Sequence, residues 1–123
     1  MLTLAQLSQL SGVSRRTLQD YDAMGLLKHH ETTAGGYWLY AEEDADRLQL
    51  IQLLRRSGCT RKELLPIFSD ASATPLQLLE RVREALLTRR ERINQLLQHV
   101  DMARLRLLQQ EQSEGADGAH SAM

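Results

Sequence analysis

The chain has 123 residues, a length typical of one compact domain, and 42% of them are apolar, which is enough for a hydrophobic core. Its formal net charge is −1, which argues against strong sequence-independent binding to nucleic acid but leaves room for a local basic face. Aromatic residues make up only 4%, and leucine, glutamine, glutamate and arginine are frequent, which favours a mainly α-helical fold.

Several classes of protein are disfavoured by what the sequence lacks. The single cysteine, Cys59, excludes an internal disulfide and a multi-cysteine metal site within one chain, and we expect it to be a small buried residue. No apolar run approaches the ~20 residues that cross a bilayer, so we expect a cytoplasmic protein with no membrane partner. No nucleophile–base pair, phosphate loop or ligand cluster is visible, so we expect no enzyme activity, no metal and no cofactor.

Residues 4–27 predict two short helices joined by a tight turn. Thr3 and Gln6 match a capping box at the start of the first helix, Gly12 ends it, and Ser14 is a suitable N-cap for the second. The positions expected to face the core recur at helical spacing: Leu4, Leu7 and Leu10 in the first helix, and Leu18, Tyr21 and Met24 or Gly25 in the second.

This spacing leaves four polar residues of the second helix pointing away from the core: Arg15, Arg16, Gln19 and Asp20. Two helices around a tight turn, with arginines in the exposed first turn of the second, are typical of a helix-turn-helix that meets DNA. An ordinary helical hairpin with a solvated polar face explains the same residues equally well.

Residues 28–40 predict a small β-hairpin, or wing, around the turn Ala34-Gly35-Gly36. Three of the five aromatic residues of the chain lie in it. Strand alternation places Tyr37 on one face of the hairpin and Trp38 and Tyr40 on the other. The rings either pack the hairpin onto the helices or, for Trp38 in particular, contact a ligand or DNA.

Two further helices are expected after the hairpin. Residues 41–57 carry acidic residues in the first turn and arginines in the last, with Leu48, Ile51 and either Leu53 or Leu54 as the buried stripe. A shorter helix follows from a Thr60–Glu63 capping box, and Pro66 should kink or shorten it. The cations around the connecting turn form either a solvated corner or a phosphate-contacting one: Arg55, Arg56, Arg61 and Lys62.

A long helix is expected from Thr74 as N-cap and Pro75 as first helical residue. Eight of its nine heptad core positions are apolar, and the nine are Leu79, Val82, Leu86, Arg89, Ile93, Leu96, Val100, Ala103 and Leu107. A helix over 74–111 is roughly 55 Å long, more than the N-terminal part can cover. The seam therefore predicts an antiparallel coiled coil in a symmetric homodimer, with Arg89 weakening it locally or setting its register.

These elements predict a mainly α-helical protein of three parts. Residues 1–70 form a winged helix-turn-helix domain with a small β-hairpin wing, residues 74–112 form the dimerisation helix, and residues 113–123 form a disordered tail of small polar residues.

The order of elements and several short motifs closely resemble the MerR family of bacterial transcription regulators over roughly residues 1–110. The motifs are Val13-Ser14-Arg15-Arg16-Thr17-Leu18, Tyr21-Asp22-Ala23-Met24-Gly25-Leu26-Leu27, Gly36-Tyr37, Leu39-Tyr40, Asp46-Arg47-Leu48 and Leu50-Ile51. The linker and the start of the long helix are most similar to the TipA-type, multidrug-responsive branch, although this chain ends before the separate effector domain of that branch.

The resemblance implies a homodimer that binds a pseudo-palindromic promoter and bends or untwists its spacer, so that RNA polymerase, an indirect partner, can use it. Its second helix would enter the major groove, and its wing would touch the flanking DNA. A small-molecule effector is a further partner that the family implies. The residues expected to contact DNA are Ser14, Arg15, Arg16, Thr17, Gln19, Asp20, Tyr21, Lys28, Gly36, Tyr37, Trp38, Arg55 and Arg56.

Three positions depart from the family pattern. Gln19 and Trp38 stand where arginine is usual, and Asp20 stands where an aromatic residue or histidine is usual. Gln19 can still read adenine, and Asp20 can accept a hydrogen bond from cytosine, so the departures are compatible with altered specificity. The alternative is a MerR-like dimer with weakened DNA binding that acts through a protein partner or a small apolar ligand.

Overall fold

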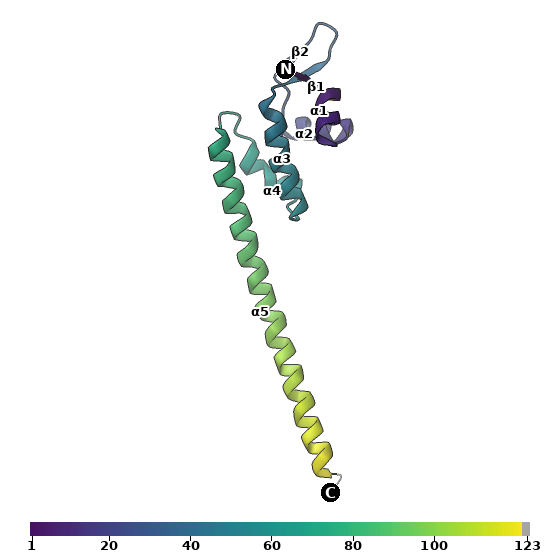
Figure 1. The fold of residues 1–123 in the computed structure, drawn as a ribbon, viewed down its shortest axis with the longest axis vertical. Coiled ribbons are helices and arrows are strands. Elements are labelled where there is room, and N and C mark those ends of the chain that lie inside the picture. The colour runs from purple at the N-terminus through teal and green to yellow at the C-terminus, as the bar shows by residue number, and fades with distance from the viewer. Residues whose placement is uncertain (122–123) are drawn as a thin grey trace. The chain divides into compact units, whose positions relative to one another are not determined.

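The computed structural model describes residues 1–121, with side chains described as far as residue 114, and divides the chain into two units that meet between Leu86 and Leu87. Eight elements follow in order (Figure 1): β1 Leu2–Thr3, α1 Leu4–Ser11, α2 Arg15–Met24, β2 Glu31–Thr32, β3 Trp38–Tyr40, α3 Glu43–Arg56, α4 Arg61–Phe68 and α5 Pro75–Ser121. None of the helices in this described range is both long and apolar enough to cross a membrane.

Helices α1 and α2 begin and end as their capping residues predict. Thr3 and Gln6 form a capping box at the start of α1, and Gly12 closes its C-terminus with a φ of 75°, a left-handed conformation that glycine adopts without strain. The Ser14 side chain accepts a hydrogen bond from the backbone N–H of Thr17 at the start of α2. The turn between the two helices is therefore fixed by local hydrogen bonds.

The wing is a three-stranded antiparallel sheet rather than the expected two-stranded hairpin. Its strand order is β1-β3-β2, with Leu2 opposite Tyr40 and Glu31 opposite Leu39. The added strand, β1, is only two residues long, too short for strand alternation to show in the sequence. Its pairing ties the start of α1 to the wing.

One core holds the first unit together, and it is mostly leucine. Leu48, Ile51 and Leu54 of α3 are fully buried, whereas Leu53 is 40% exposed, which decides between the two alternatives for that helix. The expectation that Leu10 faces the core was wrong. Leu10 is 69% exposed, since no neighbouring element covers it at the end of α1. Of the two alternatives at the end of α2, Met24 is 36% exposed and Gly25 is partly buried.

Helix α4 is short, as Pro66 predicts, and ends at Phe68. Arg47 of α3 donates hydrogen bonds from one guanidinium nitrogen to the carbonyl oxygens of Phe68 at 2.7 Å and Asp70 at 3.2 Å. A side chain of α3 thus donates hydrogen bonds to carbonyl oxygens at and just beyond the C-terminus of α4, where the helix itself offers no donor.

Helix α5 begins at Pro75 with Thr74 as its cap, and its first two expected seam positions differ, since Leu79 is 53% exposed whereas Val82 is buried. Val82 is only 4% exposed and lies with Leu78 in the core of the first unit, while Leu86 is half-buried against it. The assignment of Val82 to a dimer interface is wrong because its own chain already covers it.

The end of α5 also differs from the expected boundary. The helix continues past residue 112 as far as Ser121, where a disordered tail over 113–123 is expected. The segment contains no proline to stop the helix. Residues 122–123 lie outside the described residues.

Two leucines of α1 provide a matched test of the core. Leu7→Ala should lower the free energy of unfolding by about 3 kcal/mol because it opens a cavity at a fully buried position. Leu10→Ala, at a position 69% exposed, should change it by less than about 0.5 kcal/mol. Urea denaturation followed by circular dichroism measures both, and similar losses for the two variants would contradict this packing.

Candidate DNA-binding interface

The first two turns of α2 carry most of the residues expected to read DNA. Arg15, Arg16 and Gln19 are exposed, and neither Arg15 nor Gln19 has a side-chain partner within the described residues. Ser14 and Thr17 are occupied locally, since the Ser14 hydroxyl donates to that of Thr17 while capping the helix. The helix therefore presents two cations and one free amide beside its N-terminus, where the helix dipole is positive.

Tyr21 does not belong to this surface. Its side chain is 5% exposed and lies in the hydrophobic core, and the Arg61 guanidinium covers its ring at 5.2 Å from the centroid. The expectation that Tyr21 contacts DNA conflicts with this burial. Tyr21 stands one turn after Thr17 and three residues after buried Leu18, on the inward face of the helix.

Asp20, the acidic departure on α2, lies between two arginines. One carboxylate oxygen is 3.6 Å from Nε of Arg16, one turn earlier, and the other is 3.5 Å from Nη1 of Arg61, in the first turn of α4. The expected carboxylate is thus present on the surface of α2, but it has cationic neighbours on both sides.

The turn between α3 and α4 forms the expected basic corner. Arg55, Arg56 and Lys62 are exposed at it, and the Arg55 Nη1 donates to the carbonyl oxygen of Cys59 at 2.8 Å. Cys59 itself is buried, as expected. The cations of this corner are exposed to solvent, and one of them, Arg55, also stabilises the turn by its hydrogen bond.

The wing presents Tyr37 to solvent, with 70% of its surface exposed, next to Gly36, whose φ of 84° allows the tight turn. Trp38 is half-buried instead, and its ring stacks on the imidazole of His29 with centroids 4.4 Å apart and planes at 4°. Lys28 is exposed just before this stack. Trp38 thus packs the wing onto the chain segment that precedes β2.

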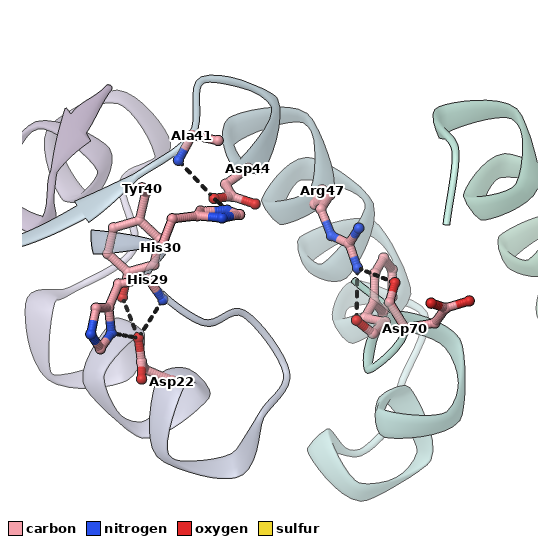
Figure 2. A network of polar contacts seen from close by, with 9 residues as sticks. Asp22, His29, His30, Tyr40, Ala41, Asp44, Arg47 and Asp70 are labelled. Carbon is pink, nitrogen blue, oxygen red and sulfur yellow. Dashed lines mark hydrogen bonds and ion pairs between the residues drawn. The ribbon is translucent and has the colours of Figure 1, made fainter. Parts of the chain in front are cut away.

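A buried carboxylate joins α2 to the wing (Figure 2). One oxygen of Asp22, a residue only 5% exposed, accepts hydrogen bonds from the backbone N–H of His29 at 2.7 Å, from His29 Nδ1 at 2.7 Å and from the Tyr40 hydroxyl at 3.2 Å. Since a carboxylate only accepts, the Nδ1 of His29 carries the proton. Asp22 is interior, so it does not add negative charge to the outer face of α2.

A second carboxylate joins the wing to α3 (Figure 2). Asp44, also 5% exposed, accepts from His30 Nε2 at 3.0 Å and from the backbone N–H of Ala41 at 2.9 Å. The adjacent histidines, which show no metal-ligand spacing in the sequence, thus serve as two ties of the wing. No group of three or more metal-ligating side chains occurs among the described residues.

Burial and the neighbouring carboxylate of Asp22 raise the pKa of the Tyr40 hydroxyl well above its usual value. Burial disfavours the charged phenolate, and both the charge of Asp22 and the hydrogen bond to it favour the protonated form further. Tyr40 therefore stays a hydrogen-bond donor over the whole physiological range.

A cavity of about 800 Å³ lies in the first unit beneath the segment from Gly25 to His30. Its walls come from the N-terminal half of α3, the end of α4, the linker after it and the start of α5. Leu26, Leu50 and Phe68 line it, whereas Trp38 and Tyr40 do not. Trp38 and Tyr40 therefore pack the wing onto the first unit and do not build this cavity.

The second unit consists of α5 from Leu87 onward, and it leaves large apolar side chains exposed. The expected seam positions Ile93, Leu96, Val100 and Leu107 are each at least half exposed. Further apolar residues outside the expected seam are exposed as well: Leu97, Met102, Leu105 and Leu108. The exposed apolar surface is wider than the heptad pattern indicates.

Sequence reasoning missed the roles of Arg61 and His29. Arg61 was visible only as one of four cations at a turn, and its partner Asp20 lies 41 positions earlier, too far for any local rule to join them. His29 could have been suspected as a wing residue because it stands beside a second histidine and before the aromatic strand.

A helix-turn-helix with an exposed cationic second helix, followed by a small antiparallel sheet, defines a winged helix-turn-helix protein. The model of the MerR HTH family regulatory protein matches residues 2–69, more than half of the chain. The chain therefore belongs to the MerR family, a family of transcriptional regulators and not of enzymes.

Curated relatives and solved structures agree with this assignment. The transcriptional regulator SkgA of Caulobacter vibrioides is 36% identical over 99 residues, which cover 80% of this chain and 39% of SkgA. The transcriptional activator mta of Bacillus subtilis is 31% identical over 96 residues, 78% of this chain and 37% of mta. The chain thus spans about two fifths of the length of these relatives.

Two crystal structures match most of the fold. The structure of SkgA from Caulobacter crescentus has a TM-score of 0.56 at 34% identity and covers 84% of this chain and 76% of that one. The N-terminal part of the Bacillus subtilis multidrug transporter activator, MtaN, has a TM-score of 0.54 at 29% identity and covers 84% of this chain and 97% of that one.

The Tyr40–Asp22 hydrogen bond predicts a pH-dependent difference between the wild type and Tyr40→Phe. At neutral pH the variant should lose about 1 kcal/mol of unfolding free energy because Asp22 loses a buried donor. Above pH about 10, tyrosine ionises in the unfolded chain while folded Tyr40 keeps its proton, so the wild type alone loses this stability as pH rises.

Urea denaturation from pH 7 to 11 checks this, and the two curves should converge on the alkaline side. Tyr37→Phe, at an exposed position, is the matched control and should follow the wild type throughout. A constant offset between the wild type and Tyr40→Phe over the whole range would contradict the role given to this hydrogen bond.

Proposed function

We propose that this protein is a homodimeric, sequence-specific DNA-binding transcription regulator that acts on promoter DNA by bending or untwisting the spacer. The observation that carries the proposal is the exposed first part of α2, where Arg15, Arg16 and Gln19 point into solvent from a helix whose start is capped. Arginine side chains contact phosphates and guanine, and glutamine pairs with adenine, so this surface suits a major groove.

The wing and the basic corner extend the proposed interface. Tyr37 at the wing tip and the exposed Lys28 offer contacts to the flanking backbone, and Arg55 and Arg56 add cations at the corner. Trp38 is excluded from direct reading of DNA in this proposal because its ring is stacked on His29. It contributes by holding the wing in place.

The second unit supports association through α5. Ile93, Leu96, Val100 and Leu107 are exposed at heptad spacing, and side chains of this size are normally covered in a folded protein. An antiparallel pairing of two copies covers them and gives the two DNA-reading helices two-fold symmetry, as a pseudo-palindromic operator requires. Bending the DNA between the half-sites then gives RNA polymerase, an indirect partner, access to the promoter. In this proposal the protein works in the cytoplasm.

The alternative of a dimer with weakened DNA binding rests on Gln19, Asp20 and Trp38. Two of these departures have structural roles in the chain: Asp20 pairs with Arg16 and Arg61, and Trp38 packs on His29. Gln19 remains exposed and is itself a DNA-reading residue type. These observations favour the DNA-binding function.

The DNA-binding surface is tested by the double variant Arg15→Ala/Arg16→Ala. A duplex is first selected from a random pool by the wild type, and binding is then followed by fluorescence anisotropy at several salt concentrations. Loss of the two cations should weaken binding on the order of 100-fold near 0.1 M salt and reduce the slope of the salt dependence by about 0.9 for each phosphate that is no longer neutralised.

The melting temperature should stay within a few degrees of the wild type because both side chains are exposed. Arg104→Ala/Arg106→Ala removes the same charge from the second unit and should leave the affinity per dimer unchanged. Unchanged affinity of the Arg15/Arg16 variant would place the interface elsewhere.

The dimer seam is tested by Ile93→Asp. A carboxylate at this position should separate the copies, because an unpaired charge is costly in an apolar interface. Light scattering should then give the mass of one chain, 14.0 kDa, instead of twice that mass. Glu91→Asp, an exposed acidic control outside the heptad core, should remain dimeric. A dimeric Ile93→Asp protein would refute the assignment.

A further inference from the structure

We infer that Asp20 makes the DNA-binding surface selective by holding Arg16 and Arg61 in internal ion pairs, for which the phosphates of a duplex must compete. The inference rests on the proposed DNA-binding function. It assigns to Asp20 a positioning role through the two arginines, in place of direct contact with a base.

The geometry allows one carboxylate to serve both arginines. Each oxygen of Asp20 faces a different guanidinium, that of Arg16 on the same helix and that of Arg61 on α4. The two contacts lie at 3.6 and 3.5 Å, so neither is a short bidentate pair. The surface of α2 thus carries its own anion at a place where DNA phosphates would approach.

These pairs are weak enough to be exchanged for phosphates. The side chain of Arg16 is 86% exposed, and that of Asp20 is 43% exposed, so water screens their attraction. A phosphate oxygen offers the same guanidinium a closer partner and releases counterions from the DNA. Replacing Asp20 by a phosphate as the partner of an arginine becomes favourable only on a duplex that also fits the rest of the interface.

Arg61 is held on α2 by a second contact. Its guanidinium lies over the ring of Tyr21 as well as beside Asp20, and its side chain is 37% exposed. Loss of the Asp20 charge would leave Arg61 near α2 through the ring, with its charge free to attract a phosphate. The same change would free Arg16.

Asp20 is also the only carboxylate among the thirteen residues expected to contact DNA. Its neighbour along the chain, Asp22, is buried and bonded to His29 and Tyr40, so it contributes little to the outer face. The carboxylate of Asp20 on the outer face lowers the attraction of the protein to every duplex, whereas contacts to bases favour only the duplex with the matching sequence. The ratio of specific to nonspecific binding rises as a result.

The test is Asp20→Asn, which keeps the shape of the partly exposed side chain and removes its negative charge. The probes are a selected duplex and a scrambled duplex of equal length and composition, measured by anisotropy at several salt concentrations. Affinity for the scrambled duplex should rise roughly tenfold at low salt, with a steeper salt dependence, because two guanidinium groups per chain become available. Affinity for the selected duplex should rise less, so discrimination falls.

Two controls separate pairing from net charge and from folding. Glu80→Gln removes one exposed carboxylate on α5 and should change neither affinity nor discrimination. In an Arg61→Ala background, Asp20→Asn should have a smaller effect on scrambled DNA than in the wild type, because one of the two arginines it releases is gone. Equal melting temperatures exclude a folding defect.

The outcomes separate this inference from the proposed function. If the wild type binds DNA and Asp20→Asn leaves the scrambled duplex unaffected while weakening the selected one, Asp20 reads a base and the inference is wrong. If Asp20→Asn changes nothing, the inference alone fails. If the wild type binds no duplex at low salt, both the proposed function and the inference that rests on it fail.

Discussion

The buried carboxylate of Asp22 is the constraint on which the arrangement of the first unit depends. A buried charge needs hydrogen-bond partners, and one oxygen of Asp22 accepts from three donors of His29 and Tyr40. Those donors lie at the base of the wing, so satisfying the carboxylate sets the wing relative to α2. The side chain of Asp22 therefore joins the two elements proposed to touch DNA.

Three aspartates play different parts because their surroundings differ. Asp22 is interior and joins α2 to the wing, and Asp44 joins the wing to α3. Asp20, two residues before Asp22, lies on the opposite face of the same helix, where it meets arginines and solvent. A count of charges along residues 1–40 gives zero, yet it misses that one of the negative charges is buried, so the outer surface is more positive than the count suggests.

The starts of α1, α2 and α4 could be predicted from sequence because capping is local. Thr3, Ser14 and Thr60 each act within three residues, and the structure confirms all three. Burial at helix ends could not, as Leu10 shows, because it depends on what the neighbouring elements cover. Val82 fits the heptad pattern yet packs in its own core. Periodicity tells which face of a helix is apolar but not which partner covers it.

The same distinction applies to the candidate interface. The exposed residues of α2 follow from helical spacing alone, whereas the Asp20–Arg61 pair and the Trp38–His29 stack join segments that only the fold brings together.

The most direct measurement of the proposed DNA-binding surface is the change in backbone amide NMR shifts of the labelled protein on adding a selected duplex. We expect changes confined to residues 14–20, Lys28, the tip of the wing and the corner at Arg55–Arg56. Changes centred on other surfaces, or none at saturating DNA, would contradict a DNA-binding surface built on α2 and the wing.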